Sequence, residues 1–234
     1  ANGRSFLIAI DDPALFAALA LHDALTRRGV AISGRAVARH DYGDAASRAI
    51  QEQPVELAGR TSPPLVESLR ILNKVSQNLH AEMVLRAVAA SRGRPGSLKI
   101  GLEEMEAFLS EVDIPKGSYD LADGSGLSRL NLVAPSAITR LLEFMARSEH
   151  SEQWLTLFPV GGEDGTLGGR FRGVHDADRI RAKTGSLEHT GALAGYAEIR
   201  PGERLAFSIL VNNFNGAPSA IRSLIDRIVG AILP

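Results

Sequence analysis

The 234-residue chain has no cysteine, which excludes disulfide bonds and thiolate metal sites. It also lacks any apolar run close to the roughly 20 residues that cross a bilayer, so we expect no transmembrane segment. Charge of one sign is not in excess, because the formal net charge is -1. That balance gives no broad attraction to nucleic acid or to anionic membranes. The 44% hydrophobic and 23% charged residues are typical of a soluble globular chain.

Cofactor and metal motifs are missing as well. Neither Gly-x-x-x-x-Gly-Lys-Ser/Thr nor Gly-x-Gly-x-x-Gly occurs, so a phosphate cradle is not predicted and we expect no cofactor. The six histidines lack a metal-ligand spacing such as His-Glu-x-x-His. They are His22, His40, His80, His150, His175 and His189. The nearest approach to a metal cluster is His175 with Asp176 and Asp178, and we predict no metal there.

The first 60 residues have a mixed pattern. The apolar run Phe6 to Ile10 predicts a strand, and a helix should begin after the N-cap residue Asp12 and end near Arg28. Residues 30–37 predict a second strand, and residues 55–57 a short one inside a polar connector. Because an apolar run follows the first residues so closely, we expect the chain to be cut from a longer protein or processed.

The middle of the chain is rich in helical periodicity. Apolar residues recur at three- and four-residue spacing in stretches that begin near residues 65, 79, 102 and 135, and each predicts a helix. Asp123-Gly124-Ser125-Gly126 predicts a loop, in which a structural role for Asp123 is more common than a catalytic one.

The last third of the chain changes to strands. Residues 161–173 contain six glycines and predict an irregular loop. Residues 179–184 predict a strand, residues 192–199 and 204–212 a hairpin, and a final helix follows Pro218. A helical block followed by adjacent strands and a covering helix indicates an α+β fold with an antiparallel sheet.

Lys183-Thr184-Gly185 lies on the first of these strands. An extended peptide can pair with an exposed strand edge, and a glycine lets its backbone approach closely. The Lys183 ammonium and the Thr184 hydroxyl suit a terminal carboxylate. The N–H of Ser186, just beyond, can point at a developing oxyanion. The motif therefore predicts a substrate-binding edge.

Ser76-Gln77-Asn78 lies between two predicted helices. A tight bend there can present Ser76 and Asn78 on one side. The Asn78 amide can hydrogen-bond to a peptide C=O and N–H. The Ser76 hydroxyl can relay a proton to a leaving amine if Lys183 holds this hydroxyl by a hydrogen bond. We therefore expect the two motifs to line one cleft, with Ser76, Asn78 and Lys183 as catalytic residues.

Neither motif is specific alone. Average residue usage gives Lys-Thr-Gly by chance in about one chain in twenty of this length, and Ser-x-Asn in about half of such chains. A helix junction at Ser76 and a solvated Lys183 are the structural alternatives. Arginines near Lys183-Thr184-Gly185 either attract an anionic peptide or form a charged strand face. They are Arg170, Arg172, Arg179 and Arg181.

Four stretches together resemble the penicillin-binding protein 4 type D-alanyl-D-alanine carboxypeptidase/endopeptidases, peptidase family S13. They are NKVSQNLHAE at 73–82, DGSGLS at 123–128, DGTL at 164–167 and RAKTGSL at 181–187. The motif set is that of β-lactamases and penicillin-binding proteins. The resemblance implies the serine β-lactamase/DD-peptidase-like fold. It also implies that residues 1–56 are a remnant of inserted domains and that residues 57–234 are the C-terminal part of the penicillin-binding domain.

The resemblance further implies a serine-type reaction on peptidoglycan stem peptides, binding of β-lactams and a periplasmic or other extracytoplasmic location. It makes Ser76 and Asn78 the second motif, Lys183, Thr184 and Gly185 the third, and Ser186 a substrate contact. The family's first motif, Ser-x-x-Lys, has no counterpart, because none of the four lysines has Ser or Thr three residues before it. We therefore expect the nucleophile outside this chain, which alone would be inactive.

Two other interpretations remain open. The chain could be a non-catalytic module that holds muropeptide ends, or a structural, partner-binding domain with a degenerate site.

Overall fold

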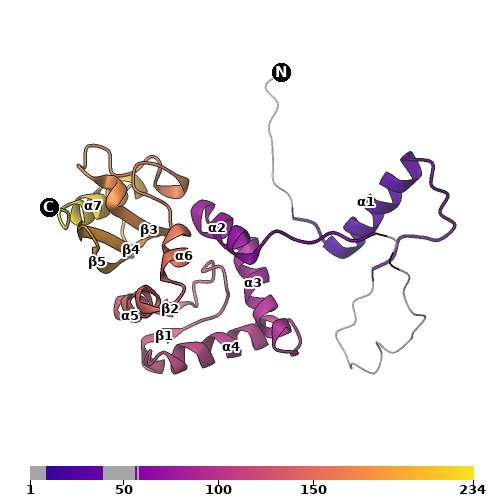
Figure 1. Ribbon diagram of the computed structural model, residues 1–234, viewed down its shortest axis with the longest axis horizontal. Coiled ribbons are helices and arrows are strands. Elements are labelled where there is room, and N and C mark those ends of the chain that lie inside the picture. Colours follow the sequence, from indigo (N-terminus) through magenta and orange to yellow (C-terminus); the bar gives the residue numbers. More distant parts are fainter. Residues whose placement is uncertain (1–8, 39–55, 57) are drawn as a thin grey trace, which may run out of the picture. The chain divides into compact units, whose positions relative to one another are not determined.

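The computed structural model describes residues 9–38, 56 and 58–234 (Figure 1). The chain divides into two compact units, Ala1–Arg60 and Thr61–Pro234.

The first unit contains the helix α1 (Pro13–Arg27). The Asp12 side chain caps it by accepting a hydrogen bond from the Leu15 N–H at 3.0 Å, and Gly29 follows with a φ of +81°. This helix, with its start and its stop, confirms the prediction.

The strand predicted for residues 30–37 is wrong, because these residues form no strand. Their apolar side chains are exposed, and no strand of the described part of this unit pairs with them. A strand needs a partner for its backbone groups, and a local apolar pattern does not supply one. Ala9 and Ile10 are not in a strand either. The rest of the predicted Phe6 to Ile10 strand lies outside the described residues, as do Val55 and Leu57.

The second unit begins with the helices of the middle region. Their bounds are α2 (Leu65–Val75), α3 (Asn78–Ser91), α4 (Leu98–Glu111), α5 (Pro135–Arg147) and α6 (Ser151–Thr156). The predicted helices are confirmed, and only the short α6 has no predicted counterpart. A 3-10 turn, η2 (Lys116–Ser118), and a two-residue strand pair, β1 (Tyr119–Asp120) with β2 (Leu132–Val133), frame the loop between α4 and α5.

The main sheet is antiparallel, with the order β3-β4-β5. Its strands are β3 (Ile180–Leu187), β4 (Thr190–Arg200) and β5 (Glu203–Asn212), followed by the helix α7 (Pro218–Gly230). The predicted hairpin and last helix are confirmed. The glycine-rich segment before the sheet is not wholly irregular, because it contains the 3-10 turn η3 (Gly165–Leu167). A second 3-10 turn, η4 (Ala177–Arg179), lies between this segment and β3.

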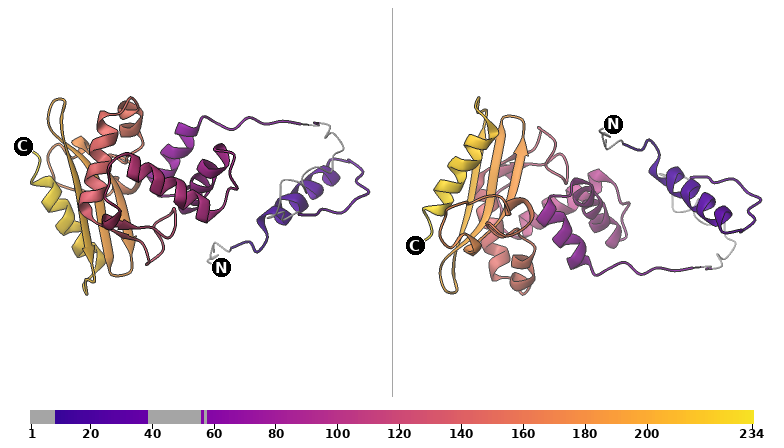
Figure 2. Two further views of the ribbon diagram at one scale, coloured as in Figure 1. Left: turned by 90° about the horizontal axis from the view of Figure 1, so that it is seen from below. Right: turned by 90° about the horizontal axis from the view of Figure 1, so that it is seen from above.

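Helices cover both faces of this sheet. Figure 2 shows α7 lying along one face and α5 on the other. On the α7 face, Ile225 and Val229 pack with Ile180 and Leu193 in the main buried cluster. On the α5 face, a second cluster is built around Tyr196. The sheet is thus fixed between two apolar layers, and this holds β3 in place.

Tyr196 ties the second layer together by hydrogen bonds. Its hydroxyl donates to the Leu142 carbonyl oxygen at 2.6 Å and accepts from the Trp154 indole N–H at 2.9 Å. Burial raises the pKa of this hydroxyl above its ordinary value, although the bond from Trp154 acts in the opposite direction. Tyr196 therefore joins α5, α6 and β4 with its polar group satisfied.

Candidate active site

Ser76 occupies the bend between α2 and α3. It caps α2 in the left-handed conformation, with φ of 59° and ψ of 57°, and its N–H bonds to the Leu72 carbonyl oxygen. The Gln77 N–H bonds to the same oxygen at 2.9 Å, and α3 begins at Asn78. A left-handed conformation is uncommon for a residue other than glycine. Here it ends α2, and α3 begins two residues later.

The Lys183 side chain meets this bend. Its ammonium donates to the Ser76 hydroxyl oxygen at 2.7 Å and to the Thr184 carbonyl oxygen at 2.8 Å. The structure therefore brings the second and third motifs together. Burial lowers the pKa of Lys183 below its ordinary value. At a given pH, a larger fraction of this amine is neutral than for an exposed lysine, which favours proton exchange with a neighbouring hydroxyl.

Asn78 and Ser186 are both exposed to solvent. Asn78 is exposed in the first turn of α3, two residues beyond Ser76. Its side chain has no hydrogen bond to any residue that the structure describes, so both ends of its amide are available. Ser186 is also exposed, on β3.

β3 is an edge strand of its sheet. Its first half is covered, because the Ala182 N–H donates to the Pro159 carbonyl oxygen at 3.1 Å and Gly161 donates to Ile180 at 2.9 Å. From Lys183 onward, no strand in the described part of the chain pairs with this edge. Backbone N–H groups alternate sides along a strand, so the Ser186 N–H points to the same side of β3 as the Ala182 N–H. At Ser186 this side of the strand is free. The edge has the orientation expected for pairing with an extended peptide.

Gly185 also has a packing reason within the sheet. It lies opposite Ala192 on β4, and a Cβ at this position would be 3.1 Å from the Ala192 Cβ. The close approach of a ligand backbone, expected from the sequence, remains a prediction.

Three further residues lie beside the motifs. Lys74, in the last turn of α2, forms an ion pair with Asp164. The Thr184 hydroxyl donates to the Thr166 hydroxyl oxygen at 3.0 Å. Motif chemistry gave these residues no role. The only signal in the sequence was that both NKVSQN and DGTL lie in stretches that resemble family S13.

Comparison with known proteins gives the family. Residues 1–231 match the model of the D-Ala-D-Ala carboxypeptidase 3 (S13) family. The chain belongs to peptidase family S13. It is 35% identical over 222 residues to a D-alanyl-D-alanine carboxypeptidase of Actinomadura sp. strain R39, which covers 92% of this chain and 40% of the relative. It is 38% identical to D-alanyl-D-alanine carboxypeptidase DacB of Haemophilus influenzae, over 68% of this chain and 34% of the relative.

Solved structures agree with this family. Penicillin-binding protein 4 of Haemophilus influenzae, complexed with a β-lactam, matches with a TM-score of 0.81 and 31% identity, over 95% of this chain and 51% of that chain. The TLA-1 extended-spectrum β-lactamase matches with a TM-score of 0.56 and 17% identity, over 72% of this chain and 62% of that chain, which shows the fold alone. The predicted α+β, serine β-lactamase-like fold is confirmed. The S13 chain described here spans 40% or less of the two relatives' sequences.

The Asp123 loop of this S13 chain is held by its own hydrogen bonds. The Asp123 carboxylate accepts from the N–H groups of Gly126 at 2.7 Å and Ser128 at 2.6 Å and from the Asn131 amide at 2.8 Å. Burial would raise the pKa of Asp123, but these bonds outweigh it and lower the pKa. The geometry supports the structural role that the sequence favours for Asp123.

Glu82 fixes the same loop to α3. Its carboxylate accepts from the N–H groups of Gly124 and Ser125, each at 3.0 Å, and from Arg86 at 2.7 Å. Burial acts to raise the pKa of Glu82, and these bonds, with the Ser125 side chain, bring the pKa below its ordinary value. The loop is therefore attached to the helix that begins with Asn78.

Two of the arginines near the third motif are paired. Arg170 donates to Asp226 on α7 at 2.5 and 3.0 Å, and Arg179 lies 3.3 Å from Asp176. This supports the structural alternative for both. Among the described residues, no group of three or more acidic or histidine side chains could hold a metal ion. No helix in that part of the chain is long and apolar enough to cross a membrane.

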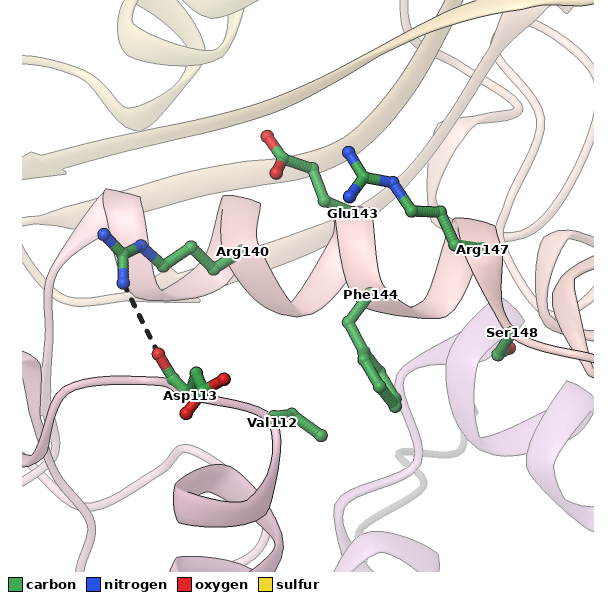
Figure 3. Close-up of a pocket in the computed structure, with 7 residues that line it drawn as sticks. All are labelled: Val112, Asp113, Arg140, Glu143, Phe144, Arg147 and Ser148. Atoms are coloured by element: carbon green, nitrogen blue, oxygen red, sulfur yellow. Dashed lines mark hydrogen bonds between the residues drawn. The ribbon is translucent and has the colours of Figure 1, made fainter.

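A hollow of about 360 Å³ lies between α5 and the end of α4 (Figure 3). The Arg140 guanidinium donates to the Asp113 carbonyl oxygen across it at 3.4 Å. None of the predicted site residues lines it. Its lining residues are Val112, Asp113, Arg140, Glu143, Phe144, Arg147 and Ser148.

Proposed function

We propose that this chain is the C-terminal part of a serine-type D-Ala-D-Ala carboxypeptidase/endopeptidase that acts on peptidoglycan stem peptides. The observation that carries the proposal is the 2.7 Å hydrogen bond between Lys183 and Ser76, found in a member of family S13. Ser76, Asn78 and Lys183 are its catalytic residues, and Thr184, Gly185 and Ser186 bind substrate.

In this proposal the nucleophilic serine lies outside the 234 residues. No Ser-x-x-Lys occurs in the sequence, and the chain spans 40% of its Actinomadura relative. The amphipathic helix α2 has no buried residue. Around Ser76, Ile71 is 51% exposed, Val75 58% and Leu79 67%. Large exposed apolar side chains beside a polar site usually mark an interaction surface, which fits contact with the segment that carries the nucleophile.

The proposed domain organisation follows from the same argument. Residues 1–56 are the remnant of a domain inserted between the first and second motifs. Residues 57–234 are the C-terminal part of the penicillin-binding domain. The division of the chain into two compact units at Arg60 and Thr61 supports this organisation.

The reaction begins when the serine attacks the penultimate D-Ala carbonyl carbon: its hydroxyl proton passes to the lysine of the same Ser-x-x-Lys motif, and a C–O bond forms. Negative charge then develops on the carbonyl oxygen, and the Ser186 N–H on the free edge of β3 stabilises it. One such donor contributes about 2.7–4 kcal/mol in the transition state. The intermediate collapses by breaking the C–N bond, and the leaving amine receives a proton through the Ser76 hydroxyl. Water then hydrolyses the ester.

The other residues orient the peptide. The Lys183 ammonium and the Thr184 hydroxyl, which turns its proton from Thr166 to the ligand when substrate binds, hold the terminal carboxylate, since charge-assisted hydrogen bonds are the stronger ones. The Asn78 amide pairs with the peptide backbone. Its exposure and the absence of a partner among the described residues leave it free to do so. Lys183, whose pKa burial lowers, returns a proton to Ser76 after this hydroxyl has given its own to the leaving amine.

The proposal places the protein outside the cytoplasm, where peptidoglycan stem peptides lie, and makes it a target of β-lactams. A fluorescent penicillin tests this. We expect it to label the complete protein covalently and to leave the 234-residue chain unlabelled. An unlabelled complete protein, shown to be folded, would contradict the proposal.

A second candidate function is non-catalytic binding of muropeptide ends, which the missing Ser-x-x-Lys favours. Calorimetric titration of the chain with a D-Ala-D-Ala stem peptide separates the two. Binding together with a native gene that begins near Ala1 supports the binding module. An upstream Ser-x-x-Lys in the gene supports the enzyme.

A further inference from the structure

The segment Asp164–Leu167, which the proposed reaction does not use, touches both motifs of the site. Its 3-10 turn η3 is in contact with α2 on one side and with β3 on the other. The contact between Ser76 and Lys183 joins these same two elements. The segment is therefore placed to fix how the bend at Ser76 lies against β3.

On the side of the second motif, the contact is an ion pair. The Asp164 carboxylate pairs with Lys74, two residues before Ser76, and also accepts from the Val160 N–H at 2.9 Å. Burial would raise the pKa of Asp164, but the bonds from Lys74 and Val160, with the charge of Arg181 nearby, lower it. The Lys74 side chain is only 19% exposed. A half-buried ion pair is thus made where α2 ends.

Backbone packing reinforces this pair. Gly165 has a φ of +53°, and a Cβ there would be 2.2 Å from the Lys74 carbonyl oxygen. Such a distance leaves no room for a side chain, and the positive φ also favours glycine. The turn therefore lies directly on the last turn of α2.

On the side of the third motif, the contact is a hydroxyl pair. The Thr166 hydroxyl accepts from Thr184 at 3.0 Å, and the next residue, Leu167, is fully buried in the cluster beneath the sheet. Leu167 anchors the turn, and Thr166 joins it to the residue next to Lys183.

We propose that Asp164 and Thr166 are positioning residues, which hold the bend at Ser76 and the strand at Lys183 in the geometry that allows their hydrogen bond. Asp164 acts through Lys74, and Thr166 acts through Thr184. The consequence for catalysis rests on the proposed function, whereas the consequence for the Ser76–Lys183 contact does not.

The first test uses the chain itself and needs no activity. The sequence has only four lysines, so the ε-carbon resonance of Lys183 can be followed by NMR in a protein with labelled lysine, and Lys183→Arg assigns it. We expect the pKa of Lys183 to rise toward the ordinary lysine value in Thr166→Val, because loss of the Thr184 contact exposes the amine. Thr166→Ser, which keeps the hydroxyl, should leave it unchanged.

Asp164→Asn provides a second, independent arm, because it removes the ion pair at nearly constant size. The same rise is expected for Lys183 in this variant. An unchanged Lys183 pKa in a folded Thr166→Val or Asp164→Asn protein overturns the positioning role of that residue. An equal change in Thr166→Ser and Thr166→Val also overturns the role of the Thr166 hydroxyl.

The second test uses the complete protein. Thr166→Val and Asp164→Asn should each lower the rate of β-lactam acylation at least about tenfold and change its pH profile, since small displacements of catalytic groups are costly. Thr166→Ser should keep the acylation rate and the pH profile of the unaltered protein. If the unaltered complete protein is not acylated, the proposed function fails, and the NMR titration still decides the positioning role. Normal rate and pH profile in both variants overturn the catalytic consequence.

Discussion

Lys183 and Ser76 are 107 residues apart in the sequence, and their side chains share a hydrogen bond of 2.7 Å. One residue comes from the edge strand β3 and the other from the left-handed bend between α2 and α3. The contact unites a partly buried amine of lowered pKa with a hydroxyl with which it can exchange a proton. We regard it as the centre of the proposed site.

Removal of either motif should abolish most of the acylation. In a complete version of the protein, we expect Lys183→Ala or Asn78→Ala to reduce the rate of β-lactam acylation at least about 100-fold, because contacts made in the transition state are lost. Rates come from stopped-flow or gel-based labelling. Lys99→Ala, on the exposed face of α4, is the matched control and should be unaffected. Near-normal acylation in either site variant contradicts the assignment.

The stability effect of Lys183 should depend on pH. Burial lowers its pKa in the folded state, so between that pKa and the unfolded value of about 10.4 the unfolded chain binds more protons. The cost of burying the charged amine is therefore complete below the folded pKa and is relieved as pH rises through this window. The difference in free energy of unfolding between Lys183→Met and the unaltered chain should therefore favour the variant more at pH 7 than near pH 10. Urea unfolding at the two pH values measures this difference. A constant difference would contradict the lowered pKa.

Asp164 should show the opposite dependence. Its pKa is lowered in the folded state, so its contribution to stability is complete above the unfolded value of about 3.9 and is lost as pH falls through the folded pKa. Asp164→Asn should therefore destabilise the chain at pH 7 and lose this effect in acid. Urea unfolding at both pH values checks this. An effect that persists undiminished below both pKa values would exclude the charged pair as its cause.

The sheet should depend on its apolar contact with α7. Ile225 is 1% exposed and packs in the main cluster, so Ile225→Ala should reduce the free energy of unfolding by about 2–5 kcal/mol. Ile228, on the same helix, is 47% exposed, and Ile228→Ala is the matched control with a cost of about 1 kcal/mol or less. Similar losses in the two variants would contradict the described packing.

Local sequence signals predicted much of the fold. Asp12 predicted the start of α1 because its side chain can satisfy a helix N–H, and the 3.0 Å bond to Leu15 is that contact. Apolar residues at every second position of residues 204–212 predicted β5, which pairs with β4. The strand predicted for residues 30–37 is wrong, because an apolar pattern does not indicate whether a neighbouring strand is present to pair with it.

The long-range contacts of the site could not be predicted by such rules. Asp164 and Lys74 are 90 residues apart, and no local pattern indicates that the two lie together. The left-handed conformation of Ser76 also had no signal, since serine usually avoids it. The resemblance to family S13 marked all these stretches as belonging together, but gave Lys74, Asp164 and Thr166 no roles.

The most direct test of the account locates the acylated residue. The complete protein is treated with a β-lactam, digested and analysed by mass spectrometry for the peptide that carries the acyl group. We predict the adduct on the serine of a Ser-x-x-Lys motif outside these 234 residues. An adduct on Ser76, or on any other residue of this chain, would contradict the claim that the chain supplies the binding half of a site whose nucleophile lies elsewhere.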